Sequence, residues 1–248
     1  MHQKSQANKE TIRADKLLSS LGIASRRSIE KFVSSNAVMA NDVRIKEHGQ
    51  RIPKNASITI NGKKLIKPKK VYFLLNKPKG IVSTSSDEFN RRNVVSLIKT
   101  DERIFPIGRL DRDTHGLLIL TNDGELTNML IHPRYHVPKT YLLKIKGQVT
   151  NDHLESLTNG VELDDGVTAK AKATVLQRRK DGTIVELTIF EGRKRQIRRM
   201  CDALNLTLLD LERIKLGTLD ITGIKLGEYR ELSGKEIEDL RRKSLNKV

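Results

Sequence analysis

The sequence predicts an α+β protein with two domains: a small one of two helices and short strands, then a larger one of helices and a mainly antiparallel sheet. Two helix patterns and several short strand candidates lie before residue 67. The segment Lys67-Pro68-Lys69-Lys70 has no apolar residue and contains a proline, which is typical of a domain boundary. Beyond it, several runs alternate apolar and polar residues, and Asp181-Gly182 joins two of them as a hairpin. We expect a disordered tail over 1–10, a first domain over 11–66, a linker over 67–70 and a second domain over 71–248.

The charge of the chain favours a polyanionic partner. Its 248 residues include 47 Lys and Arg against 30 Asp and Glu, a net charge of +17. Such a balance indicates nucleic acid rather than a neutral metabolite as the binding partner. The alternative is a solvated basic surface without a specific partner. Membrane binding is the weaker competitor, because the cationic segments lack a long apolar face and no apolar run is long enough to span a bilayer.

The cysteine and histidine content predicts a metal-free protein of a reducing compartment. Cys201 is the single cysteine and cannot form an internal disulfide, and no Cys or His cluster has zinc spacing. The first ten residues lack the apolar core of a signal peptide. We therefore expect a cytoplasmic protein, and a monomer by default.

The first domain begins with two predicted helices. Leu17, Leu18 and Leu21 form an apolar stripe that Gly22 ends, and Ser25 can cap a second helix. Arg26 and Arg27 then lie in the first helical turn, where the macrodipole disfavours cations. A phosphate bound by both arginines would explain that placement, and two solvated arginines remain the structural alternative. Short strand candidates follow at 38–39, 43–45 and 57–60, and Asn61-Gly62 marks a tight turn.

The second domain opens with Val71–Leu75, an unbroken apolar run typical of a strand buried on both faces. Lys77 and Lys79 follow in a sharp turn, where local evidence favours solvated side chains. The polar segment 83–93 predicts a mobile loop before a short helix at 94–98. A helix carrying Leu126, Met129 and Leu130 is expected after Gly124, and Thr150 can cap another that ends before Gly160.

A short polar break, Gly108-Arg109-Leu110-Asp111, separates residues 105–107 from the apolar strand 117–120. It holds a carboxylate at the mouth of a buried strand, with Arg112 and His115 nearby. Such a carboxylate can serve as a nucleophile or a base. Tyr141 begins a strand in which apolar and polar residues alternate, and local evidence makes it an ordinary half-buried residue.

A helix expected over 194–204 has a buried stripe and a cationic side. Cys201 belongs to the stripe and is best explained by core packing. Cations at a helix start are opposed by the dipole, so a phosphate or a carboxylate partner is expected to offset them. The cations are Arg193, Lys194, Arg195, Arg198 and Arg199. Short strands near 208–209, 219–221 and 229–230 and a helix opened by a Ser233 and Glu236 capping box complete the chain.

Several segments together resemble the pseudouridine synthases of the RsuA, RluB, RluE and RluF type. They are Asn76-Lys77-Pro78-Lys79-Gly80, Gly108-Arg109-Leu110-Asp111 with Gly116-Leu117-Leu118, Lys139-Thr140-Tyr141 and the run from Glu191 to Met200, in the family's order. The run 13–43 resembles the small RNA-binding domain first known from ribosomal protein S-four, so that the likeness covers roughly residues 12 to 240. Phe105–Asp111, Arg195–Cys201 and Ile224–Arg230 look most similar to RluF-type members, whose substrate is large-subunit ribosomal RNA.

The resemblance implies a catalytic domain with a central antiparallel sheet flanked by helices and an active site in a cleft across it. It implies that uracil is detached from ribose at N1, turned while bound and rejoined through C5, without a cofactor or metal. Asp111 is then the essential carboxylate, Tyr141 stacks on the uracil and can take its C5 proton, and Arg198 pairs with Asp111. A cation beside a carboxylate favours the ionised form.

The resemblance also implies the RNA contacts. Lys77 has a supporting role, and the arginines of the front domain, Arg26 and Arg27, contact RNA. Arg195 replaces a histidine that many related synthases carry, and RluF-like members share the arginine. The other expected RNA contacts are Arg109, Arg193, Lys194, Arg195 and Arg199.

Other interpretations remain open from the sequence. The substrate could be small-subunit ribosomal RNA or transfer RNA instead of large-subunit RNA, and the target uridine is not named by any motif. A non-catalytic RNA-binding factor for ribosome assembly is the second class of function, and a DNA-binding enzyme is a third with less support. Whether Asp111 attacks the ring, attacks the sugar or removes a sugar proton is also undecided.

Overall fold

The structure is a computed structural model that describes residues 10–25, 28–85 and 91–245. It divides the chain into two compact units, one of Met1–Lys70 with Asp101–Arg103 and a second that comprises Val71–Thr100 and Ile104–Val248. The division falls at the end of the expected 67–70 linker. The expected disordered tail lies outside the described residues apart from Glu10. No helix of the described residues is both long and apolar enough to cross a bilayer.

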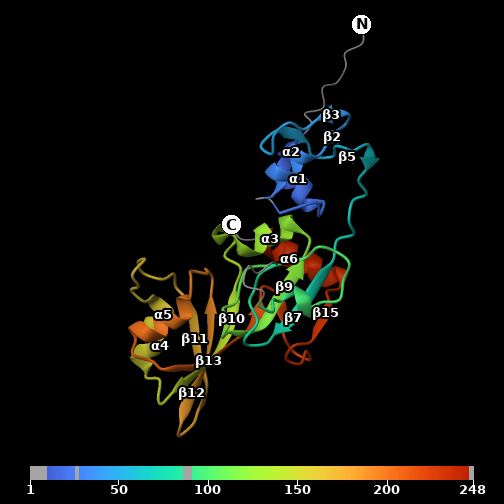
Figure 1. Ribbon diagram of the computed structural model, residues 1–248. Coiled ribbons are helices and arrows are strands. Elements are labelled where there is room, and N and C mark those ends of the chain that lie inside the picture. The colour runs from blue at the N-terminus through green and yellow to red at the C-terminus, as the bar shows by residue number, and fades with distance from the viewer. Residues whose placement is uncertain (1–9, 26–27, 86–90, 246–248) are drawn as a thin grey trace. The chain divides into compact units, whose positions relative to one another are not determined.

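The first unit packs two short helices against short strands (Figure 1). The helix α1 (Ala14–Ser20) ends as predicted, with Gly22 in the left-handed conformation at φ +78°. The hydroxyl of Ser25 accepts a hydrogen bond from the Ser28 amide at 3.2 Å, but Ser28 precedes the second helix, so the predicted cap by Ser25 is not formed. The helix itself, α2 (Ile29–Ser35), begins later than predicted. Arg26 and Arg27 lie outside the described residues.

The strands of this unit are joined by tight turns. A four-stranded sheet has the order β3-β2-β5-β6, and β1 pairs with β4 beside it. Asn61 and Gly62 have φ of +49° and +81° between β5 and β6, as the Asn-Gly turn predicted. Three of the strands were too short to predict from alternation. The bounds are β1 (Thr11–Arg13), β2 (Val38–Ala40), β3 (Val43–Arg44), β4 (Arg51–Pro53), β5 (Ile58–Ile60) and β6 (Lys63–Lys64).

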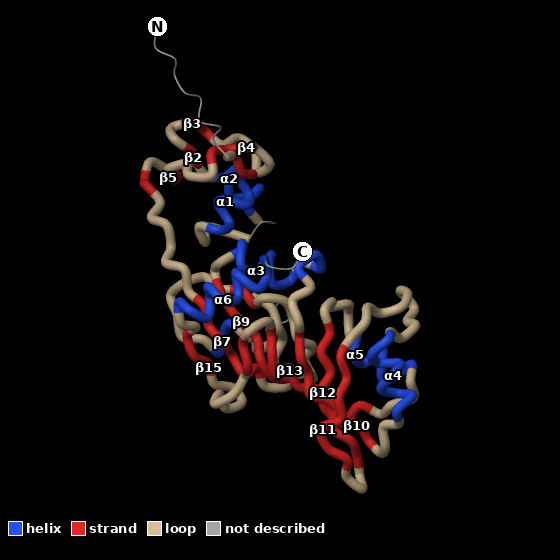
Figure 2. The backbone as a smooth tube through the Cα atoms, turned by 180° about the vertical axis from the view of Figure 1, so that it is seen from behind, coloured by secondary structure: helices blue, strands red, loops and turns tan. Residues whose placement is uncertain are grey.

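The second unit is built on one sheet with the order β11-β12-β10-β13-β9-β7-β15, with β14 paired to β13 and β8 paired to β9 (Figure 2). All neighbours are antiparallel except β13 and β9, so the prediction of a mainly antiparallel sheet is confirmed. The bounds are β7 (Tyr72–Lys77), β8 (Phe105–Pro106), β9 (His115–Thr121), β10 (Lys139–Lys146), β11 (Lys172–Arg178), β12 (Gly182–Ile189), β13 (Leu208–Leu216), β14 (Leu219–Asp220) and β15 (Tyr229–Glu231).

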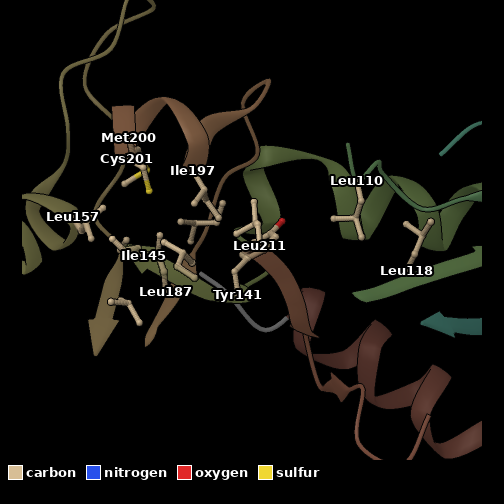
Figure 3. Packing of buried hydrophobic residues seen from close by; sticks show 14 of the residues in the cluster. Leu110, Leu118, Tyr141, Ile145, Leu157, Leu187, Ile197, Met200, Cys201 and Leu211 are labelled. Atoms are coloured by element: carbon tan, nitrogen blue, oxygen red, sulfur yellow. The ribbon is translucent and has the colours of Figure 1, made fainter. Parts of the chain in front are cut away.

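Two hydrophobic cores cover the two faces of this sheet. In β9, Leu118 and Leu120 belong to one core, whereas Leu117 and Ile119 belong to the other. The first core includes residues of α4 and α5 (Figure 3), and the second includes residues of α3 and α6. Strand β7 is likewise buried on both faces, as its apolar run predicted. The helices are α3 (Gly124–Ile131), α4 (Asn151–Asn159), α5 (Gln196–Ala203) and α6 (Gly234–Leu245), with 3₁₀ turns η1 (Val95–Leu97) and η2 (Pro133–Tyr135).

The ends of these helices are fixed by side chains. Thr150 and His153 form a capping box at α4, and Ser233 and Glu236 form the predicted one at α6. The start of α5 differs from the prediction, because the helix begins at Gln196 and not at Lys194. Arg195 stands before it in the left-handed conformation at φ +49°. Three of the five cations therefore precede the helix, and fewer of them oppose its dipole than expected.

The single parallel junction of the sheet depends on a glycine. Gly116 of β9 pairs with Arg213 of β13 and has φ of +105°. A Cβ atom there would lie 2.3 Å from the carbonyl oxygen of Arg213, which is part of the backbone and cannot rotate away. Only glycine satisfies both the close approach and the left-handed φ.

We predict that Gly116→Ala lowers the free energy of unfolding by about 3 kcal/mol, because the junction must open and the backbone is strained. Urea denaturation of the purified protein measures the change. Gly124→Ala is the control: Gly124 begins α3, a Cβ there meets no atom within 4 Å, and stability should stay the same or rise by up to about 1 kcal/mol. Equal stability of the two variants would contradict the steric argument.

Candidate active site

A cleft of about 780 Å³ opens in the second unit beside the central strands. Its wall is formed by the segment 105–111, by β10, by the loop before α5 and by β13. The cleft brings together three residues singled out in the sequence, Asp111, Tyr141 and Arg198. Its volume suits a ligand of nucleotide size.

The segment carrying Asp111 is held by buried hydrogen bonds. Gly108 turns the chain after β8 at φ +71°, and the Leu110 side chain is buried. The Ser83 hydroxyl donates to the Leu110 carbonyl at 2.8 Å and accepts from the Leu110 amide at 3.2 Å. Ser83 was assigned to a mobile loop by its polar neighbours. It is buried instead, because it replaces the hydrogen-bond partners that this irregular backbone lacks.

The side chain of Lys77 also holds the segment that carries Asp111. Its side chain is fully buried, and its Nζ donates to the carbonyl oxygens of Asp111 at 3.1 Å and Thr114 at 2.8 Å. Pro78 and Arg112 supply two further carbonyl contacts at 3.1 and 3.5 Å. Burial lowers the pKa of Lys77 to about 8, against the opposing attraction of Asp113 and Asp111. The expected RNA contact of Lys77 is therefore wrong for this geometry, and so is the solvated-turn interpretation, because the amine is enclosed by backbone carbonyls.

Two arginines flank the carboxylate of Asp111. The Oδ2 atom lies 3.6 Å from Nη1 of Arg195 and 3.8 Å from Nε of Arg198, distances of ion pairs rather than hydrogen bonds. Arg198 also donates through Nη2 to the Asp113 carbonyl and the Thr114 hydroxyl, both at 3.2 Å. Its buried Nε has no hydrogen-bond partner among the described residues. Arg195 was predicted by name only as an RNA contact, and the expectation of a carboxylate partner for the cations near α5 did not name Asp111 as the partner of Arg195.

Tyr141 contributes an aromatic wall to the cleft. It lies in β10, where its neighbours Leu143 and Ile145 share its face and are completely buried. The tyrosine itself is only 7% exposed and packs in the first core (Figure 3). The local interpretation as half-buried underestimated its burial. Its ring is fixed in place by the sheet and by Leu187 and Leu211 of that core.

The remaining predicted cations divide into two groups. Arg109 and Lys194 are exposed and line the cleft. Arg193 is instead held by the loop 164–167, where it donates to the carbonyl oxygens of Gly166 at 2.7 Å and Val167 at 2.6 Å. Arg199 binds the carboxylates of Asp164 and Asp165 in the same loop.

Carboxylates of the loop 164–167 offset cations near the start of α5. Of the two partners that the sequence predicted for these cations, a phosphate or a carboxylate, the carboxylate is found for Arg193 and Arg199. The hydrogen bond from Arg199 is the main reason that the pKa of Asp165 is lowered. Arg193 and Arg199 therefore stabilise the loop before α5, and the terminal nitrogens of both guanidinium groups already have acceptors, although the buried Nε of Arg199 has none among the described residues. Among the described residues, no group of three or more His, Cys, Asp or Glu side chains could hold a metal ion.

Two cations of the cleft were missed as site residues. Lys139, quoted above only as part of a motif, lines the cleft two residues before Tyr141. Burial, followed by repulsion from Arg213, lowers the pKa of Lys139 to about 8. Arg213 is 3% exposed and also lines the cleft. The alternation of Leu211 with Arg213 could have signalled an inward arginine, but the sequence predicted only the first residues of β13.

We predict that Lys77→Met lowers the free energy of unfolding by roughly 3 kcal/mol, since the carbonyl oxygens of Pro78 and Thr114 lose the lysine donor and those of Asp111 and Arg112 keep only a backbone amide. Lys79→Met is the matched control, because Lys79 is half exposed and pairs at 2.6 Å with Asp210 on the surface, so its loss should change stability by less than about 1 kcal/mol. Chemical denaturation of both variants makes the comparison. A small and equal effect of the two substitutions would show that the carbonyl contacts of Lys77 are not stabilising.

Comparison with known proteins identifies the family. Residues 71–203 match the family model described as RNA pseudouridylate synthase. The chain is 41% identical over 232 residues to the ribosomal large subunit pseudouridine synthase B of Bacillus subtilis, covering 92% of this chain and 95% of that protein. It is 34% identical to the dual-specificity RNA pseudouridine synthase RluF of Escherichia coli, covering 93% of this chain and 78% of RluF. Similarity therefore does not single out the RluF subgroup.

A solved structure gives the same result. A crystal structure of a pseudouridylate synthase matches with a TM-score of 0.68 and 31% identity, covering 92% of this chain and 99% of that one. The sequence motifs, the cleft that contains them and the relatives that span nearly the whole chain agree. The chain belongs to the RNA pseudouridylate synthase family, among the RsuA, RluB and RluF type, and is an isomerase that acts on RNA.

Proposed function

We propose that the protein converts a uridine of large-subunit ribosomal RNA to pseudouridine, with Asp111 as the essential carboxylate. The observation that carries the proposal is the position of Asp111, which lies in the cleft between Arg195 and Arg198 and opens to solvent with 38% of its side chain exposed. The B. subtilis relative named for the large ribosomal subunit supports the choice of RNA.

The cleft supports a role for each of its main residues. A uracil that enters it meets the fixed ring of Tyr141, on which it stacks. Asp111 reaches the nucleotide from the opposite loop, because Lys77 and Ser83 hold its backbone from behind. Arg198 orients the carboxylate and clamps the segment through Asp113. Tyr141 is the candidate to receive the C5 proton once C5 has bonded to the ribose.

The substrate must expose its uridine before the reaction. A base stacked inside folded RNA cannot reach Asp111, and flipping it out costs a few kcal/mol. Arg109 and Lys194 are exposed along the cleft and can contribute phosphate contacts that offset this cost. The first unit, with its resemblance to the S-four RNA-binding domain, is proposed to bind RNA as well.

Mapping of pseudouridines by carbodiimide labelling and primer extension tests the proposal in cells that lack the gene. At least one large-subunit site should disappear on deletion and return with the wild-type gene. Asp111→Asn should fail to restore it, since a group that acts on the reacting atoms is worth more than about 10³-fold in rate. Asp113→Asn is the control, because its exposed side chain lies on the same loop and pairs at 3.6 Å with the exposed Arg112, so it should restore the site.

Each other result has a definite meaning. Loss of a small-subunit or transfer RNA site would replace the proposed substrate and leave the isomerase activity intact. Restoration by Asp111→Asn would remove Asp111 from its proposed role. RNA binding by the purified Asp111→Asn protein should match that of the wild type, which shows that the variant fails in chemistry and not in folding.

A further inference from the structure

Two cations, the buried Arg213 and the partly buried Lys139, lie next to the aromatic wall of the cleft. Arg213 of β13 is paired in register with Tyr141 of β10, so their side chains point to the same face of the sheet as neighbours. Lys139 precedes Tyr141 by two residues on the same strand and therefore shares that face. All three side chains line the cleft.

The hydrogen bonds of Arg213 are incomplete. Nε of Arg213 donates to the Leu117 carbonyl at 2.7 Å, but its buried Nη2 has no partner among the described residues. Nζ of Lys139 donates to the Val137 carbonyl at 3.1 Å. A buried guanidinium normally has an acceptor for each side of its fork. Through Nε, the arginine of β13 hydrogen-bonds to β9 at Leu117. This contact does not involve Nη2, which takes no part in joining the strands.

No carboxylate of the described residues neutralises the pair. Glu191 is the acidic group close enough to raise the pKa of Lys139, but burial and Arg213 outweigh it. Its Oε1 accepts from the Ala169 amide and from Gln196, and its Oε2 accepts from Arg193. A buried region with excess positive charge favours an anion, or a group on which negative charge develops.

We propose that Arg213, supported by Lys139, is a catalytic group that stabilises the negative charge developing on uracil when its N1–C1′ bond breaks. The inference rests on the proposed function of the cleft. The electron pair of the broken bond remains on N1 and is shared with O2 and O4, so the ring becomes an anion. C1′ is left short of that electron pair. After the ring turns, a pair from C5 forms the C5–C1′ bond, the C5 proton leaves to a base and N1 takes up a proton, so that the product is an isomer of the substrate. No oxidant or further reactant is required.

The burial of the Arg213 side chain favours the uracil base over a backbone phosphate as its partner. Its side chain is 3% exposed and is the register neighbour of Tyr141, on which the ring is proposed to stack. Phosphates of a flipped nucleotide stay near the mouth of a cleft, where Arg109 and Lys194 are exposed. The deep cations are therefore placed to act on the ring during the step in which it carries charge.

Leaving-group dependence tests the assignment. The substrate is the RNA fragment identified by mapping, carrying either uridine or 5-fluorouridine at the target position, in single-turnover reactions. Fluorine withdraws electrons, so the fluorinated ring needs less help to leave as an anion. Arg213→Met should slow loss of the N-linked uridine about 10²- to 10³-fold with KM little changed. The fold-reduction in rate that Arg213→Met causes should be at least about tenfold smaller on the 5-fluorouridine RNA. Arg213→Lys should recover part of the rate.

The outcomes separate this inference from the alternatives. Equal losses on the two RNAs would overturn it, and a raised KM with normal kcat would assign Arg213 to a phosphate. Lys215→Met, on an exposed position of the same strand, should behave as wild type on both RNAs. If the wild-type enzyme fails to convert the uridine RNA, the proposed substrate is wrong and the leaving-group question moves to the RNA that it does convert.

The role of Lys139 predicts a dependence on pH. A lysine is charged below its pKa, so a pKa of about 8 means that Lys139 is mostly charged at pH 7 and mostly neutral at pH 9. The single-turnover rate should therefore fall between about pH 7 and about pH 9. Lys139→Met should be slower at the lower pH and show a smaller fall than the wild type, the remainder coming from Lys77, whose pKa is also about 8. Lys144→Met, exposed on the same strand, should retain the full fall. An unchanged pH profile in Lys139→Met would exclude the lysine from the step.

Discussion

The buried ammonium group of Lys77 is the interaction on which the site depends. The segment between β8 and β9 is irregular, so its carbonyl oxygens have no sheet partners, and the lysine supplies donors to Asp111, Arg112 and Thr114 at once. One side chain thus allows a turn to be buried without losing its hydrogen bonds. The carboxylate of Asp111 can then face solvent in the cleft while its backbone is rigid.

The cations around the cleft fall into groups that differ in the partners of their side chains. Arg193 and Arg199 bind the loop 164–167 and thereby set the path of the chain into α5. This leaves Arg195 and Arg198 beside Asp111, and Arg213 with Lys139 deeper in the cleft. The separation matters because the terminal nitrogens of Arg193 and Arg199 are already bonded to the loop and have little left for a ligand, whereas Nη2 of Arg213 has no acceptor among the described residues and can act on the substrate.

Patterns in the sequence predicted the parts of this molecule that follow from periodicity. The doubly buried β7, the capping box at α6 and the antiparallel hairpin of β11 and β12 are all local consequences of residue order. The cleft itself was implied by the resemblance of the motif around Asp111 to a known family and not by periodicity. Lys77 and Ser83 were misjudged because their partners are carbonyl oxygens more than twenty residues away, and no side-chain pattern records a backbone acceptor.

The parallel junction between β9 and β13 connects the fold to the chemistry. Gly116 allows the backbone of β13 to approach so closely that the Arg213 side chain reaches across to the carbonyl of Leu117. A longer separation would leave the whole guanidinium in the core without an acceptor, which is costly enough to select against arginine there. With one acceptor supplied by β9 and none for Nη2, the sheet holds Arg213 in place and keeps part of its charge unpaired next to Tyr141. The hydrogen bond between Arg213 and Leu117 therefore joins β13 to β9 and also holds the guanidinium in position for a ligand.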